Sequence, residues 1–392
     1  MGSLEKLNTL LSIRLNLNDY ESIPFHFRDF AIKSGRATFS VPGEFEIDLT
    51  IADEEPESQY WFIDFRFLFQ PSSGNMSSGI RWHLENKVNE ILQKDGLSGC
   101  YKYLHELILT YKINEFRRQA ITLARSTWID TLRVEILNRP ISIQYWLNRY
   151  PDLRNPKGVL IKGTKSWIIL GVHSGRRKDS RPDPKDTSRL FIRWFRESKE
   201  VKECDISFDA TNISAESLLK SVISKHVEYI LTAIYQTLLV KPLFSNRDLE
   251  LSLHISQENP AESELKIQLT SEHRISIKID PVSGRFVFGP MCRAFANFEA
   301  GLNDRVQDPA SEGHVWIERI RLFLITEDLS TRALSVGWTK VGNPELRLDK
   351  VQQFAGKDHL AVIWFRRYGW AKDWYLAVSQ SMSGEKWYLV KT

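Results

Sequence analysis

The feature of this sequence that most limits its fold is a set of strings that recur, in the same order, about 220 residues further along the chain. The clearest match joins Glu44–Thr50 (EFEIDLT) to Glu264–Thr270 (ELKIQLT). The other matches join 66–71 to 285–290, 146–150 to 364–368, 165–167 to 385–387, and the apolar positions of 7–15 to those of 230–238. Because the matches are collinear, we predict two tandem, diverged copies of one unit, over residues 1–212 and 213–392.

Each copy is predicted to run helix, antiparallel meander, helical segment and further strands. Apolar and polar residues alternate at 39–51 and 61–69, and again within 249–279, which predicts the two meanders. Spacings of three and four predict helices over 4–15, from 80 to Gly96, over 104–123 and from 128 to Pro140, then from Ser214 to Pro242 and around 315–324. Later strands are expected at 141–147, 159–162, 167–172, 190–195, 360–365, 374–378 and 387–390. The predicted fold class is α+β, with an antiparallel sheet packed against helices in each copy and a shorter helical segment in the second.

Composition limits the functional class. The chain has 392 residues, 42% of them hydrophobic, and a formal net charge of only +4. Its densest basic run, Arg176 to Arg181, lies among Pro and Asp residues and is interpreted as a solvated loop rather than a phosphate site. Three widely spaced cysteines without a CxxC pair favour a reducing compartment and no metal site. Neither a leader segment nor a long apolar run is present, so no membrane association is expected.

Catalytic motifs are missing. His105-Glu106 is not followed by a second His at zincin spacing, and Gly171–Gly175 lacks the Lys-Ser/Thr ending of a P-loop. Cys100 lies near His105 but is more simply interpreted as an inert thiol. We therefore expect no enzymatic activity, no cofactor and no small-molecule substrate. An enzyme of unrecognised fold would need a pocket of convergent ionisable groups.

Two sequence features could serve protein binding. Leu7–Leu11 matches the LxxLL pattern of helix-in-groove ligands, although leucines at this spacing are also what an ordinary buried helix face requires. The last thirty residues are rich in aromatic side chains beside arginines, a mixture typical of interface hot spots. The candidate interface residues are Arg366, Arg367, Tyr368, Trp370 and Trp374. The alternatives are stacking of single-stranded nucleic acid and ordinary core packing.

The two Trp-apolar-x-Arg-Tyr strings, at 146–150 and 364–368, start equivalent groups of strands in the predicted copies. We therefore expect both Trp146 and Trp364 to be mostly buried. Because the helical segment of the second copy is predicted to be the shorter, we expect the larger exposed apolar patch there, near Trp370 and Trp374.

Long strings resemble the fungal branch of the Mediator of RNA polymerase II transcription subunit 14 family. They are LNTLLSIRLNLNDYESIPFHFRDF, YWFIDFRFLF, RPISIQYWL, SRLFIRWFRESKEV, DISFDATNISAESLLKSVISKHVEYIL and DWYLAVSQSMSGEKWYLV. The resemblance implies a central, repeat-containing fragment of a nuclear coactivator scaffold. Its implied partners are the other Mediator subunits of the head, middle and tail modules and, through the complex, RNA polymerase II. No catalytic residue is carried over. The alternative is a nucleic-acid-binding module that uses the Arg- and aromatic-rich C-terminal strands.

Overall fold

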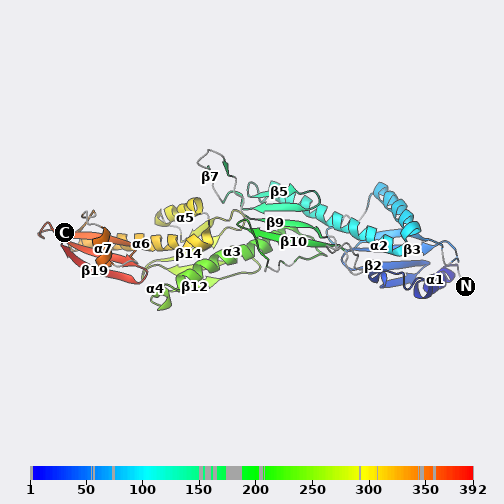
Figure 1. Ribbon diagram of the computed structural model, residues 1–392, viewed down its shortest axis with the longest axis horizontal. Coiled ribbons are helices and arrows are strands. Elements are labelled where there is room, and N and C mark those ends of the chain that lie inside the picture. The colour runs from blue at the N-terminus through cyan, green and yellow to red at the C-terminus, as the bar shows by residue number, and fades with distance from the viewer. Residues whose placement is uncertain are drawn as a thin grey trace. The chain divides into compact units, whose positions relative to one another are not determined.

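The computed structural model in Figure 1 describes residues 3–53, 55, 58–72, 76–149, 153–154, 160–161, 166–173, 188–202, 206, 208–290, 293–306, 308–342, 344, 348–355 and 359–391. These residues form seven α-helices and four larger antiparallel sheets, which confirms the α+β fold class. Two compact units are present. One comprises Met1–Gln144, Trp167–Phe195 and Glu200–Leu218, and the other comprises Tyr145–Ser166, Arg196–Lys199 and Leu219–Thr392.

The first unit begins with a helix on a four-stranded meander. α1 (Ser3–Ile13) continues as a π-helical turn (Arg14–Asn18), and a 3-10 turn (Phe25–Phe27) leads into the sheet. Its strands are neighbours in chain order: β1 (Phe30–Lys33), β2 (Arg36–Val41), β3 (Phe45–Ile51) and β4 (Tyr60–Phe67). The predicted meander is thus confirmed. The meander forms because apolar and polar residues alternate along its strands, which places Phe39, Phe45 and Ile47 together on the core face. All three side chains are fully buried.

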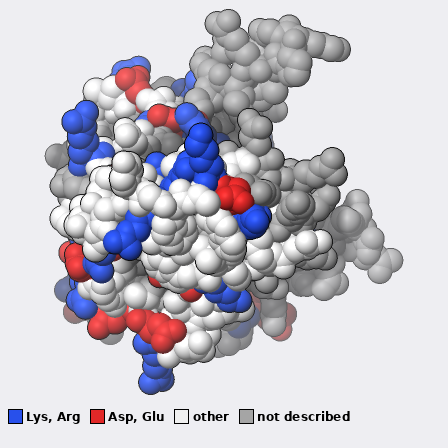
Figure 2. Space-filling model, turned by 90° about the vertical axis from the view of Figure 1, so that its left-hand side faces the viewer, with Lys and Arg blue, Asp and Glu red and all other residues white. Residues whose placement is uncertain are grey.

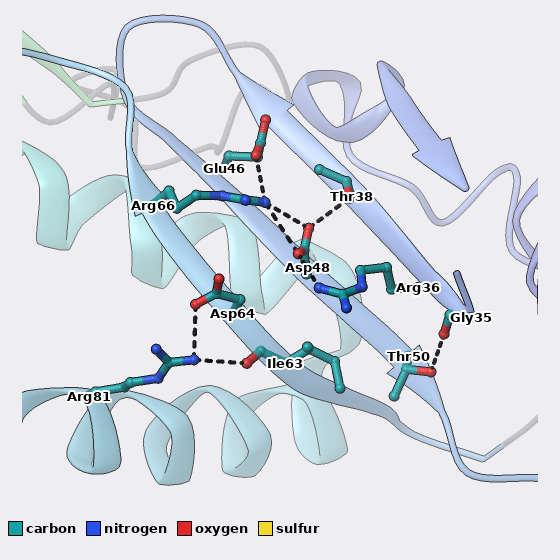
Figure 3. A network of polar contacts seen from close by, with 10 residues as sticks. All are labelled: Gly35, Arg36, Thr38, Glu46, Asp48, Thr50, Ile63, Asp64, Arg66 and Arg81. Atoms are coloured by element: carbon teal, nitrogen blue, oxygen red, sulfur yellow. Dashed lines mark hydrogen bonds and ion pairs between the residues drawn. The ribbon is translucent and has the colours of Figure 1, made fainter. Parts of the chain in front are cut away.

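The opposite face of this sheet is held by charges around one buried carboxylate (Figure 3). Asp48 is 1% exposed and accepts hydrogen bonds from the Thr38 hydroxyl (2.6 Å) and from Arg36 (3.1 Å). Arg66 from β4 reaches both Asp48 (3.2 Å) and Glu46 (2.7 Å). A buried carboxylate needs such partners, and they tie β2, β3 and β4 together.

The long helix α2 (Ser78–Arg125) covers the core of this unit and is broken once, at Gly96 (φ 61°, ψ −155°). The predicted stop near Gly96 is therefore confirmed as a kink. The part before the kink meets β4, where the Asn89 side chain accepts the Phe62 N–H (2.9 Å). The part after it packs aromatic rings against the sheet, with Tyr111 4.9 Å from Phe67 between ring centroids.

The helix predicted from residue 128 to Pro140 is wrong. Asp130 has a left-handed backbone (φ 61°), which ends helical structure, and Leu132–Ile136 then forms strand β5. It is the edge of a sheet of order β11-β10-β9-β6-β5. The other strands are β6 (Ile141–Tyr145), β9 (Trp167–His173), β10 (Arg189–Arg196) and β11 (Lys199–Glu200), and a small hairpin pairs β7 (Leu153–Arg154) with β8 (Leu160–Ile161).

α3 (Ala215–Leu239) starts as predicted, because the Ser214 hydroxyl accepts the Ser217 N–H (3.1 Å) as an N-cap. The short α4 (Pro242–Ser245) and a second meander follow. The meander consists of β12 (Leu251–His254), β13 (Glu264–Gln268), β14 (Arg274–Ile279) and β15 (Phe286–Gly289), with a 3-10 turn at Pro260–Glu262. α5 (Arg293–Arg305) and α6 (Pro309–Ser335) come next, and α5 was not predicted.

The last sheet has the order β16-β17-β18-β19 and confirms the strands predicted near the end of the chain. Its strands are β16 (Trp338–Val341), β17 (Ala361–Arg367), β18 (Trp374–Ser381) and β19 (Gly384–Lys391). Helix α7 (Leu348–Ala355) packs on one face, around Trp364 and Ala377 (Figure 1). The end of α6 packs on the other face, around Ile363, Phe365 and Val378.

Both halves therefore show helix, meander, helices and then a further sheet. The matched strings agree with the strand order only in part. The strings 66–71 and 285–290 both include residues of the fourth strand of a meander, β4 and β15, but the clearest match falls on different strands. Glu44–Thr50 belongs to the third strand of its meander, whereas Glu264–Thr270 belongs to the second. Pairing Ile47 with Ile267 thus does not follow strand order. The helical segment of the second half, predicted to be the shorter, consists of α5 with 13 residues and α6 with 27. The helical segment of the first half is α2 with 48 residues, so the difference in length is small. The repeat and its bounds, 1–212 and 213–392, stay a prediction.

Candidate protein interface

The five candidate residues lie on the turn between β17 and β18 and on its two flanks. Arg366 and Arg367 end β17, Tyr368 and Trp370 lie in the turn, and Trp374 begins β18. The turn closes through a hydrogen bond from the Trp370 N–H to the Arg367 carbonyl (3.2 Å). Gly369 between them has φ 88°, a conformation that favours glycine. The turn therefore presents Tyr368 at its tip.

Exposure differs widely among these side chains. Tyr368 is fully exposed (101%) and Arg367 is exposed, whereas Arg366, Trp370 and Trp374 are half-buried. In the described part of the chain, no acidic side chain pairs with either arginine. An exposed tyrosine beside an unneutralised guanidinium is a surface on which a partner could gain both apolar contact and charge-assisted hydrogen bonds.

The sheet separates the two arginines. Successive residues of a strand point to opposite faces, and Arg367 lies opposite Trp338 in the register while Arg366 lies opposite Thr339. Trp338 packs with Phe365 on the α6 face, so Arg367 belongs to that face and Arg366 to the α7 face. The Trp370 ring contacts Trp338 edge-on, with centroids 4.7 Å apart.

Trp374 falls on the same face as Arg367. It lies opposite Lys391, whose ammonium is 6.0 Å from the centre of the Trp374 ring and pairs with Asp373 (3.6 Å). The structure thus brings Arg367, Trp370 and Trp374 to one side of the sheet, with Tyr368 at its rim. Arg366 is not part of this group.

Two exposed residues of β19 extend this face beyond the predicted set. Trp387 and Leu389 are 55% and 57% exposed, and they lie opposite Val378 and Leu376 of β18. α6 covers Val378 but leaves these two uncovered at the sheet edge. Figure 2 views the end of the chain where this sheet lies, and its described surface shows uncharged areas between scattered Lys, Arg, Asp and Glu side chains. The sequence signal that marks the pair is the unbroken apolar run from Trp387 to Val390, because a strand that is apolar on both faces presents side chains to each side of the sheet.

The other predicted features have plain structural roles where they are described. Leu11 of the LxxLL string is fully buried in its own core, which favours the ordinary helix. Both predicted tryptophans are buried, with Trp146 1% and Trp364 5% exposed. Cys100 is buried, and burial raises the pKa of its thiol to about 12, as expected of an inert cysteine. The basic run at 176–181 lies outside the described residues, as do Cys204 and Cys292.

A shallow trough of about 400 Å³ crosses the polar face of the second meander. Its acids are held in ion pairs, Glu250 with Arg274 (3.1 Å) and Glu264 with Lys266 (3.3 Å). Partial burial raises the pKa of Glu264, but hydrogen bonds from Ser276 and Lys266 outweigh it and leave that pKa lowered. Both acids of the trough are therefore engaged in ion pairs, and Glu264 has a lowered pKa rather than the raised one of a general acid.

Among the residues that the structure describes, no group of three or more His, Cys, Asp or Glu side chains is arranged so that it could hold a metal ion. None of the helices in the described ranges combines the length and the apolar character needed to cross a membrane.

Comparison with known sequences identifies the family. Residues 234–329 match the model of the fungal Med14 domain, and residues 1–53 match that of Mediator complex subunit MED14. Relatives named Mediator of RNA polymerase II transcription subunit 14 align over nearly the whole chain. The protein from Pyricularia oryzae is 45% identical over 99% of this chain and 34% of its own length. The Neurospora crassa protein is 44% identical over 99% of this chain and 30% of its own length. The Aspergillus niger protein is 36% identical over 100% of this chain and 34% of its own length.

These matches place the chain among the subunit families of the Mediator complex. Within them it belongs to the subunit 14 family, as its sequence strings indicated. The chain spans about a third of the length of the curated relatives it matches.

Proposed function

We propose that this chain is a scaffold segment of the Mediator complex, without catalytic activity, that holds other subunits together and so supports RNA polymerase II transcription in the nucleus. The observation that carries the proposal is identity of 45% and 44% along essentially the whole chain to proteins named as Mediator subunit 14. The paired ions of the polar trough agree with a role in assembly rather than catalysis.

The contact surface that we assign to this role is the face formed by Arg367, Trp370 and Trp374, with Tyr368 at its rim. Trp387 and Leu389 enlarge its apolar part. Aromatic residues and arginine supply most of the binding energy in protein interfaces, and apolar side chains left in water gain free energy when a partner covers them. We include Arg366 as a second, weaker contact on the α7 face. The partners proposed are Mediator subunits of the head, middle and tail modules.

Reconstitution tests the proposal. The 392-residue chain would be mixed with each purified Mediator subunit of the same species and separated by size. Co-elution with at least one subunit at micromolar concentration is expected. Failure to bind any of them, while circular dichroism shows a folded chain, would contradict the scaffold function.

The nucleic-acid alternative is favoured by one observation, the full exposure of Tyr368 beside Arg367. Such a pair could stack on a base and contact its phosphate. Binding of that kind must weaken steeply with salt, because neutralising phosphates releases counterions. Titration of a single-stranded oligonucleotide at two salt concentrations separates the two functions. Tight, salt-dependent binding would favour the alternative, and its absence favours protein assembly.

A further inference from the structure

His105 of α2 is buried, at 6% exposure, and both nitrogens of its ring face hydrogen-bond acceptors. Nδ1 lies 2.7 Å from the Glu44 carboxylate, which belongs to the turn between β2 and β3. Nε2 lies 2.5 Å from the Ser188 carbonyl, immediately before β10. The ring thus joins a helix, a turn and the start of a strand within the first unit.

This arrangement fixes the protonation state of the ring. A neutral imidazole carries one N–H, whereas a backbone carbonyl and a carboxylate can only accept. Satisfying both contacts therefore requires two N–H groups on His105. We propose that His105 is an imidazolium in the folded chain and acts as a pH-dependent latch that fastens the start of β10 to α2 and to the β2–β3 turn.

Glu106, the residue after His105 in α2, makes a second contact with Ser188. Glu106 accepts a hydrogen bond from the Ser188 hydroxyl and also binds Arg139. Partial burial raises the pKa of Glu106, but the Ser188 and Arg139 contacts lower it by more, so its carboxylate is ionised. Two consecutive residues of α2 thus hold Ser188 by its carbonyl and by its side chain.

A second cation repeats the pattern on the same helix face. Lys112 lies seven residues beyond His105, two helical turns, and its ammonium donates to the Gly43 carbonyl (2.7 Å) and the Ala210 carbonyl (2.8 Å). Both basic groups therefore hold the β2–β3 turn. Burial lowers the pKa of Lys112, while the charges of Glu44 and Asp209 raise it, and the net direction is downward. The ordinary pKa of histidine lies near neutrality, so we expect the histidine end of this clamp to respond to moderate changes in pH.

The charged and titratable groups around His105 change the pKa of its ring. Burial lowers the pKa of His105, but the hydrogen bond and charge of Glu44, the Ser188 carbonyl and the charge of Glu106 raise it, and the net direction is upward. Lys112 interacts electrostatically with Glu44. The ring of Tyr101 stacks on His105, and the ring of His26 stacks on Tyr101. Burial lowers the pKa of His26, so that ring stays neutral and adds no repulsion near neutral pH.

The sign of the effect follows. A histidine whose pKa is higher in the folded chain than in the unfolded chain contributes stability that is fully present below about pH 6.5. That contribution is lost as the pH rises through the folded pKa. The latch is therefore closed at lower pH and is released by alkalinisation, which frees the start of β10.

Nitrogen NMR of the 15N-histidine-labelled chain tests this directly. At pH 6.5 to 7, both ring nitrogens of His105 are expected at the shifts of protonated imidazolium, with a titration midpoint above 6.5. Glu44→Gln keeps the side-chain shape and removes the charge, so the midpoint should move down. A neutral ring at pH 6.5 in the wild-type chain, or a midpoint unchanged in Glu44→Gln, would overturn the proposal.

Stability gives a second readout. The urea midpoint of the wild-type chain should fall between pH 6.5 and 8.5, and this fall should be absent from His105→Gln. The matched control is His83→Gln, an exposed histidine on the same helix, which should retain the wild-type pH dependence. An equal slope in all three chains would contradict the latch. If His105→Gln does not fold, the Glu44→Gln titration still decides.

Discussion

The indole ring of Trp146 occupies the space into which a side chain at Gly284 would project. A Cβ placed on Gly284 would lie 2.4 Å from Cδ2 of the indole. The indole Nε1–H of Trp146 donates a hydrogen bond to the Pro281 carbonyl in the same turn (2.8 Å). The other side of the ring stacks on His226, with centroids 4.4 Å apart. Trp146, His226 and Gly284 all belong to the second unit, and within that unit the indole fixes the segment after Tyr145 to the β14–β15 turn.

Gly284→Ala should be strongly destabilising. The added methyl meets the indole, and the φ of 71° is strained for any residue with a Cβ. We expect a loss of roughly 2–4 kcal/mol in the free energy of unfolding, measured in urea. Gly337→Ala is the matched control, because its φ is 81° but nothing lies within 4 Å. It should show only the backbone cost, about 1–2 kcal/mol. Equal losses at both sites would refute the packing contact.

Trp146→Ala and Trp364→Ala should each cost about 3–5 kcal/mol, because each removes a large buried side chain. Their surroundings differ, since Trp146 packs against a glycine and a histidine while Trp364 lies in the α7 cluster with Val351 and Ala377. Trp82→Ala, at a site 67% exposed, should change the unfolding free energy by less than about 0.5 kcal/mol. Chemical denaturation of the three variants compares them, and a small loss at either buried site would count against its core role.

Asp48→Asn should destabilise the first meander by about 1–3 kcal/mol, since it weakens charge-assisted bonds to Arg36 and Arg66 at a buried site. The comparison is Asp64→Asn, which loses only a more exposed ion pair with Arg81 (3.0 Å). That change should cost no more than about 1 kcal/mol. Thermal unfolding of both variants measures the difference. The interpretation of the network fails if the exposed pair proves as costly as the buried one.

Arg367→Glu and Tyr368→Ala should weaken co-elution with a partner subunit tenfold or more, a typical hot-spot effect, while leaving the melting temperature unchanged. Ala at Trp370 or Trp374 should weaken binding too, with some loss of stability because those rings are half-buried. Arg366→Glu should have the smaller effect, since it lies on the α7 face. The exposed Trp82→Ala serves as the binding control. Normal assembly by both the Arg367 and the Tyr368 variant would eliminate this surface.

Local patterns predicted much of the fold. Alternation located both meanders, and the Ser214 cap located the start of α3. Spacing misled at Trp128, Leu132 and Ile136. These residues fit a helix by spacing, but the left-handed Asp130 separates Trp128 from the other two, which lie in β5. The sequence did not predict that Arg366 and Arg367 point to opposite faces of the sheet, because the predicted strand ended at residue 365 and β17 includes both arginines. The role of His105 could not be predicted, because its partners Glu44 and Ser188 lie 61 and 83 residues away in the chain.

The break at Gly96 also sets the phase of α2. At about 100° per residue, a straight helix would carry Leu84, Val88 and Leu92 on nearly the opposite side from Leu104 and Ile108. All five are nevertheless buried, because the glycine conformation rotates one segment against the other. Gly96 has open space around it, so its conformation rather than crowding demands glycine. One residue without a side chain thus lets two apolar stripes that a straight helix would place on opposite sides both be buried.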